Sequence, residues 1–193
     1  MVEQYRTVYQ GGGGEFTEKK SRFLGQAAHV ETEEEAQAFI ERLKKQYWDA
    51  SHNCWAYVLG TRGEMMRCSD DGEPQGTAGR PMLDVLTGRQ MCNTVVVVTR
   101  YFGGTLLGTG GLVRAYSRGA QCALDASVLV DKYLARKLKM TVEYTELGKV
   151  QYLLAQEGIQ TLDTEYGANV WIAAPVPVGQ TEALKKKLTE GTN

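Results

Sequence analysis

The chain has 193 residues, of which 42% are hydrophobic, and its formal net charge is −1. This composition excludes a disordered chain and a protein with a generally basic surface for nucleic acid, although it permits a local basic patch. No apolar run approaches the about 20 residues of a membrane helix, and the N-terminus, MVEQYRTVYQ, lacks the pattern of a signal peptide.

The first predicted elements are strands followed by a helix. Weak alternation predicts an edge strand over Tyr5–Val8, and Gly11–Gly14 predict a flexible tip. A second strand is expected over Phe23–Val30. Thr32 and Glu35 have the spacing of a capping box at a helix start. The residues after this box are apolar at helical spacing, namely Ala36, Phe39, Ile40, Leu43 and Tyr47.

The middle of the chain alternates strands and helices. A strand is predicted over His52–Leu59, followed by a loop over Cys68–Gly79. Pro81 is suited to the start of a short helix that ends at Leu86. Four consecutive valines in Asn93–Thr99 predict a central strand that is covered on both faces. A longer amphipathic helix is predicted from about Gly110 to Ala126.

The last part of the chain predicts a second domain. The pattern weakens between Ser127 and Ala135, so we place one domain at residues 1–130 and another at residues 136–193. Strand–helix–strand–strand–helix order is typical of a split βαβ module, but the fourth strand of that module is missing or very short here. The expected elements are Lys137–Tyr144, Glu146–Glu157, Ile159–Tyr166, Asn169–Val178 and Thr181–Leu188.

A glycine-rich turn follows the valine strand and precedes a helix. Its sequence, VTRYFGGTLLGTGGLVRAY, is neither a Walker A motif nor the dinucleotide fingerprint, because no Gly-Lys-Ser/Thr follows and the third glycine is absent. Helix-start N–H groups and the flanking Arg100 and Arg114 could hold a phosphate. The glycines could equally serve close helix–sheet packing, with the arginines paired to acids. Both interpretations stay open.

An acidic loop supplies Asp70, Asp71 and Glu73 within four residues. Such a density could bind Mg²⁺, but Gly72 stands where an EF-hand needs an acid. The loop could instead form an ion pair with Arg100 or Arg114, or be a surface turn. We favour the ion pair or the turn, because nothing else in the chain offers convergent metal ligands.

Neither the cysteines nor the histidines predict a catalytic or zinc site. His52 and Cys54 share a strand face, but side chains two residues apart on a strand are roughly 6.5–7 Å apart. A structural or ligand-contacting role suits His52 better than a Cys–His catalytic pair. No C-x-x-C pair occurs, so we expect no metal and reduced thiols in a cytoplasmic protein. The four cysteines are Cys54, Cys68, Cys92 and Cys122.

A small basic and aromatic cluster precedes the second strand. Lys19, Lys20 and Arg22 lie beside Phe16 and Phe23 in the sequence, a combination that can contact a nucleic-acid backbone. Lysines also protect exposed sheet edges from pairing with other chains, so a solvated strand edge is the alternative.

Four of these motifs together resemble the IMPACT family in its bacterial YigZ-type branch. The motifs are KKSRF, DASHNCWAY, SDDGEPQGTAGRPML and VTRYFGGTLLGTGGLVRAY, in this order. The resemblance implies an α+β fold. Its first domain would resemble the second domain of ribosomal protein S5, and its second would be ferredoxin-like, similar to the last domain of the translocating elongation factor (elongation factor G).

The same resemblance directs the function toward translation, without a known reaction. Eukaryotic relatives inhibit the activation of a translation-regulating kinase, but they do so with an extra N-terminal domain that this sequence lacks. Relatives often carry a lysine where this chain has Thr105 or Leu106, and its absence lowers the local positive charge.

Two functions follow as hypotheses. The first is a non-enzymatic module that binds RNA, the ribosome or a translation factor. The alternative is an enzyme or sensor for a phosphorylated small molecule, with Mg²⁺ held by the acidic loop and otherwise no cofactor. A purely protein-binding regulator has no signature of its own. The candidate binding residues are Lys19, Lys20, Arg22, His52, Arg100, Gly108, Gly110, Gly111, Arg114 and Arg118.

Overall fold

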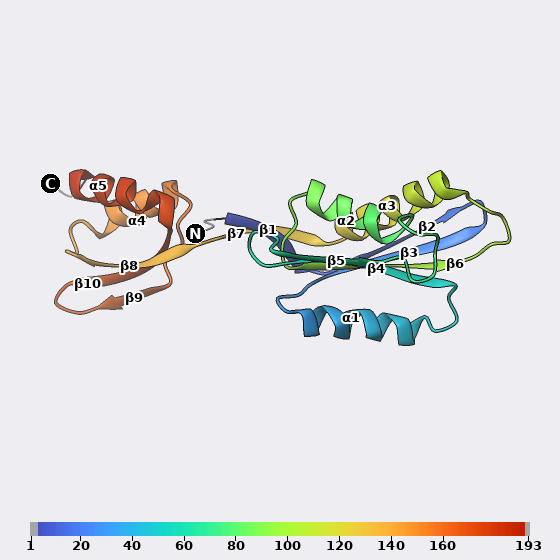
Figure 1. Ribbon diagram of the computed structural model, residues 1–193. Coiled ribbons are helices and arrows are strands. Elements are labelled where there is room, and N and C mark those ends of the chain that lie inside the picture. Colours follow the sequence, from blue (N-terminus) through green and yellow to red (C-terminus); the bar gives the residue numbers. More distant parts are fainter. Residues whose placement is uncertain (1–3, 192–193) are drawn as a thin grey trace. The chain divides into compact units, whose positions relative to one another are not determined.

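The computed structural model describes residues 4–191 and divides into two compact units, one ending at Lys132 and the other beginning at Tyr133. The fold is mixed α and β in both units, as Figure 1 shows. The elements of the first unit are β1 (Gln4–Gln10), β2 (Gly13–Glu18), β3 (Ser21–His29), α1 (Glu33–Gln46), β4 (His52–Leu59), β5 (Met65–Ser69), α2 (Gly79–Gly88), β6 (Thr94–Tyr101), α3 (Thr109–Asp125) and β7 (Val128–Tyr133).

The first unit is built on an antiparallel sheet with strand order β2-β3-β6-β4-β5. The central position of β6 agrees with its run of valines. Val96 and Val98 pack into the core under α2 and α3, whereas Val95 and Val97 pack into a second core against α1. Helices therefore cover both faces of this sheet (Figure 1).

Two strands of this unit differ from the sequence prediction. Met65–Ser69 form β5, so the predicted loop over Cys68–Gly79 begins only at Asp70. Val128–Tyr133 form β7, which pairs with β1 in a separate two-stranded sheet, in the segment where the pattern weakens. Both strands lie at sheet edges, where side chains are half exposed and hydrophobic alternation is weak.

The glycine run Gly11–Gly14 is not a flexible tip. A side chain on Gly12 would place its Cβ 2.1 Å from the carbonyl oxygen of Ala126, and one on Gly14 would lie 2.8 Å from Cβ of Cys122. The run therefore lets the start of β2 pass directly against the end of α3. These glycines serve close packing rather than mobility.

The second unit is a three-stranded antiparallel sheet with order β8-β10-β9 and two helices. This order is that of a split βαβ module whose fourth strand would lie beside β8, and no such strand occurs in the described part of the chain. Its own core contains Val170, Ile172 and Leu184. Its elements are β8 (Ala135–Val142), α4 (Leu147–Gln156), β9 (Asp163–Tyr166), β10 (Val170–Pro177), a 3-10 turn (Val178–Gln180) and α5 (Thr181–Gly191).

Candidate functional site

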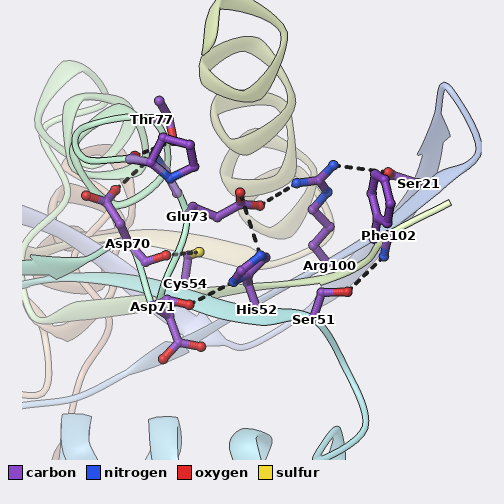
Figure 2. A network of polar contacts seen from close by, with 12 residues as sticks. Ser21, Ser51, His52, Cys54, Asp70, Asp71, Glu73, Thr77, Arg100 and Phe102 are labelled. Atoms are coloured by element: carbon purple, nitrogen blue, oxygen red, sulfur yellow. Dashed lines mark hydrogen bonds and ion pairs between the residues drawn. The ribbon is translucent and has the colours of Figure 1, made fainter. Parts of the chain in front are cut away.

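A buried ion pair joins the acidic loop to the end of β6. Arg100 donates from Nη1 to Oε1 of Glu73 over 2.6 Å, and the two side chains are only 6% and 4% exposed. The hydroxyl of Tyr116 on α3 donates to the same oxygen over 2.7 Å. Nη2 of Arg100 donates to Oγ of Ser21 over 3.3 Å, and Figure 2 shows Arg100 between Glu73 and Ser21. Arg100 thus belongs to the interior, as the ion-pair interpretation expects, and offers little surface to a ligand.

The other two acids of the loop hold the backbone in place. Both carboxylate oxygens of Asp70 accept backbone N–H groups, from Gly76 in the loop (2.8 Å) and from Gly79 at the start of α2 (2.8 Å) among others. Asp71 accepts the backbone N–H of Asn53 (2.7 Å) and pairs with Nζ of Lys44 (2.8 Å). The three acids point to different partners, and the described residues contain no group of three or more His, Cys, Asp or Glu that could hold a metal.

His52 and Cys54 also serve this loop. Nδ1 of His52 lies 2.8 Å from the backbone carbonyl of Asp71, which can only accept, so Nδ1 carries the proton and Nε2 faces Glu73 at 3.7 Å. The Cys54 thiol donates to the carbonyl of Asp70 over 3.0 Å. Burial raises the pKa of this thiol, which leaves Cys54 protonated and unsuited to act as a nucleophile.

The glycine-rich turn between β6 and α3 is fastened to the neighbouring turns. The backbone N–H of Phe102 donates to Oγ of Ser51 (3.0 Å), and that of Gly103 donates to Oγ of Ser21 (3.2 Å). A Cβ on Gly103 would lie 1.9 Å from the carbonyl oxygen of Lys20, so only glycine fits there. Gly108 precedes α3 with a φ of 75°, a left-handed conformation that favours glycine.

The remaining predicted cations are exposed, and three of them lie around one hollow. Lys19, Arg114 and Arg118 line a hollow of about 180 Å³ together with Gly111 at the start of α3 and Glu18. Arg118 lies 4.3 Å from the ring centre of Phe16 and 4.0 Å from Glu18, and Arg22 forms an exposed ion pair with Glu15. We call Lys19, Lys20, Arg22, Arg114 and Arg118 the cationic end.

Large apolar side chains that the sequence analysis did not single out are exposed in the glycine-rich turn and after α1. Phe102 is 48% exposed and Leu106 is 81% exposed in the glycine-rich turn, and Trp48 is 82% exposed after α1. Phe102 and Leu106 lie among the glycines of the glycine-rich turn, and this position is the feature of the sequence from which their exposure could have been predicted. Trp48 follows an amphipathic helix, and nothing in the sequence predicts that it is exposed.

Comparison with known proteins finds relatives over the whole chain. The family model of the Impact N-terminal domain matches residues 19–124, and a model of a domain of unknown function (DUF1949) matches residues 140–193. IMPACT family member YvyE of Bacillus subtilis (strain 168) is 42% identical over 100% of this chain and 89% of its own length. IMPACT family member YigZ of Escherichia coli (strain K12) is 38% identical over 89% of this chain and 85% of its own length.

A solved structure is similar to almost the whole chain. A crystal structure of a hypothetical protein superposes with a TM-score of 0.67 at 35% identity, covering 98% of this chain and 93% of the other. In the described residues, no helix is both long and apolar enough to span a membrane.

Proposed function

The chain belongs to the IMPACT family, and on this basis we propose that it acts in translation by binding RNA through the cationic end of its first unit. The resemblance of its two domains to parts of ribosomal protein S5 and of the translocating elongation factor directs the proposal to RNA. The observation that carries it is that Lys19 of the β2–β3 turn lines one hollow with Arg114 and Arg118 of α3, while Lys20 and Arg22 follow Lys19 closely in the chain.

The charges of the cationic end are incompletely balanced. Among residues 4–191, Arg22 pairs with Glu15 and Arg118 approaches Glu18, but Lys19, Lys20 and Arg114 have no ion pair. An RNA backbone carries a phosphate at every nucleotide, so unpaired cations grouped in this way attract it. Because the net charge of the whole chain is only −1, this attraction is local.

The two lysines occupy unusual backbone positions. Lys19 and Lys20 form the turn between β2 and β3 with φ angles of 44° and 66°. Such two-residue turns favour Asn and Gly, because other side chains are strained at positive φ. Lysine therefore does not stabilise this turn, which supports a role for its charge at the surface.

Co-sedimentation tests this function. The protein is spun with purified ribosomes and, separately, with protein-free ribosomal RNA at low and at high salt. We expect it to pellet with both at low salt and to be released as the salt rises. Pelleting with ribosomes but not with naked RNA would transfer the proposal to a protein partner, and pelleting with neither contradicts it.

The hollow beside α3 favours a second candidate, a phosphorylated small molecule. Lys19 and Arg114 line it, and the first N–H groups of a helix can bind an anion. Its volume of about 180 Å³ is below the usual 300–1,000 Å³ of ligand pockets and suits a phosphate group rather than a whole nucleotide. A thermal-shift screen of nucleotides and sugar phosphates, with and without Mg²⁺, discriminates. Ligand at about 100 times its dissociation constant adds about 2.7 kcal/mol of stability.

A further inference from the structure

We propose that Phe102 is a stacking platform for an unpaired RNA base, an inference that rests on the proposed function and names the kind of RNA that the surface takes. Phe102 lies directly after β6, and 48% of the residue is exposed. An exposed phenyl ring can stack on any base, and such stacking is a common way to bind single strands.

The ring of Phe102 is supported from inside the protein. The guanidinium carbon of Arg100 lies 5.4 Å from the centre of the Phe102 ring and 5.6 Å from that of the buried Phe23 ring. Arg100 thus contacts an interior ring and a surface ring, and Figure 2 shows it with the surface ring of Phe102. The bond from the Phe102 N–H to Ser51 fixes the backbone beneath the surface ring.

The buried polar network explains why this support is rigid. Glu73 and Ser21 both accept hydrogen bonds from Arg100, and Tyr116 holds Glu73 in turn. These bonds leave the guanidinium little freedom to swing away from Phe102. A ring that is already in position loses little conformational entropy when a ligand stacks on it, which favours binding.

The turn that carries Lys19 and Lys20 lies next to the residue that follows Phe102. Gly103, the residue after Phe102, touches the backbone of Lys20, as the 1.9 Å approach of a hypothetical Cβ shows. Lys19 and Lys20 are exposed in the same turn. When a base stacks on Phe102, the phosphates of its nucleotide therefore lie close to cations. A purely apolar protein partner would make no use of these cations.

A second exposed ring is tied to the same strand end. Trp48 is 82% exposed, and the segment that follows it is fastened by the bond from the Tyr101 hydroxyl to Asp49 (2.9 Å). Bases in a duplex are stacked and paired with each other, so rings on a protein surface can be used only by unpaired bases. The surface thus favours single-stranded over double-stranded RNA.

The test measures fluorescence anisotropy of a labelled ten-nucleotide RNA, as a single strand and as a duplex with its complement. We expect Phe102→Ala to weaken single-strand binding about 5- to 150-fold. Phe102→Trp, which keeps a ring, should bind like the wild type. In Phe102→Leu the leucine side chain still covers Arg100, but it cannot stack on a base. This variant should therefore fold and yet lose binding as Phe102→Ala does, which separates lost stacking from misfolding.

Tyr152→Ala is the matched control, because Tyr152 is an exposed aromatic residue on α4. It should leave both affinities unchanged. If Phe102→Ala and Phe102→Leu bind single strands like the wild type, or if the wild type binds duplex equally well, the inference is wrong while RNA binding stands. If the wild type binds neither RNA, the proposed function fails together with it.

Discussion

Glu73 and Arg100 each depend on the other, because both are buried and charged. Removing one member of such a pair leaves an uncompensated charge in the interior, which costs about 3–5 kcal/mol. We expect Glu73→Gln to lower the free energy of unfolding by this order, as measured by urea denaturation. Glu15→Gln breaks an exposed pair with Arg22 and should change stability little. Equal effects of the two substitutions would contradict the structural role of Glu73.

Stability should fall at alkaline pH because of two buried acids. Burial raises the pKa of the Cys54 thiol and of the Tyr116 phenol above their ordinary values of 9.0 and 10.0. The unfolded chain therefore loses these protons first, so their contribution is complete below pH 9 and is lost as the pH rises. Above its ordinary pKa, each group lowers the free energy of unfolding by about 1.4 kcal/mol per pH unit. Urea midpoints from pH 7 to 10.5 should decline less steeply in Cys54→Ala than in the wild type, and parallel profiles would refute this origin.

For single residues, the sequence predicts which acidic and basic side chains lie in the site, but not which of them form ion pairs. The acidic loop and the two arginines are visible as motifs, and an ion pair between them is an expected outcome. Which arginine forms the ion pair depends on the element to which each belongs. Arg100 ends β6 inside the sheet, whereas Arg114 lies one turn into α3 on the solvent side. That difference arises from tertiary packing.

Among the elements, the contact of α3 with β3 depends on glycines. A Cβ on Gly25 would lie 2.2 Å from the carbonyl oxygen of Gly119, so backbone meets backbone. We expect Gly25→Ala to destabilise the protein by about 1–3 kcal/mol through overpacking. A Cβ on Gly88 at the end of α2 would have no other atom within 4 Å. Gly88→Ala should therefore be neutral or stabilise the protein by up to about 1 kcal/mol. Thermal denaturation of both variants decides, and a harmless Gly25→Ala would show that the helix can move away.

The elements with strong periodicity could be predicted, and those without it could not. The valine strand and the capped helix α1 appear where their patterns place them, because a central strand and an amphipathic helix bury a regular set of side chains. Thr32 accepts the N–H of Glu35, whereas the Glu35 carboxylate accepts that of Glu31, one residue before its capping-box position. β5 and β7 are edge strands with little burial, so their side chains show no clear pattern. β5 pairs with the preceding strand β4, whereas β7 pairs with β1 at the other end of the unit's sequence.

The whole molecule has separate cores in its two units, and this predicts separate responses to core substitutions. Ile172 is 1% exposed in the core of the second unit. Ile172→Ala should cost about 2–5 kcal/mol there. Amide hydrogen exchange should show lost protection in β8, β9, β10, α4 and α5, with β3, β4 and β6 unchanged. Lost protection in both sets of strands would mean that the units unfold as one.

The net charge of the whole chain does not reveal the cationic end. Its value of −1 conceals a local excess of positive charge. Only the fold brings Lys19 and Lys20 of one turn beside the glycine-rich segment that precedes Arg114. The family motifs predict which segments belong together, and the folded chain supplies the geometry on which RNA binding is proposed.

The salt dependence of single-strand RNA binding tests that proposal most directly. The wild type is compared with a triple variant, Lys19→Gln, Lys20→Gln and Arg114→Gln, and with a control, Lys185→Gln, Lys186→Gln and Lys187→Gln on α5. Each lost phosphate contact lowers the slope of log affinity against log salt by about 0.7, so the first variant should bind more weakly with a slope shallower by about 2. The control should match the wild type. An unchanged slope in the first variant, or an equal loss in the control, would contradict RNA binding at the cationic end.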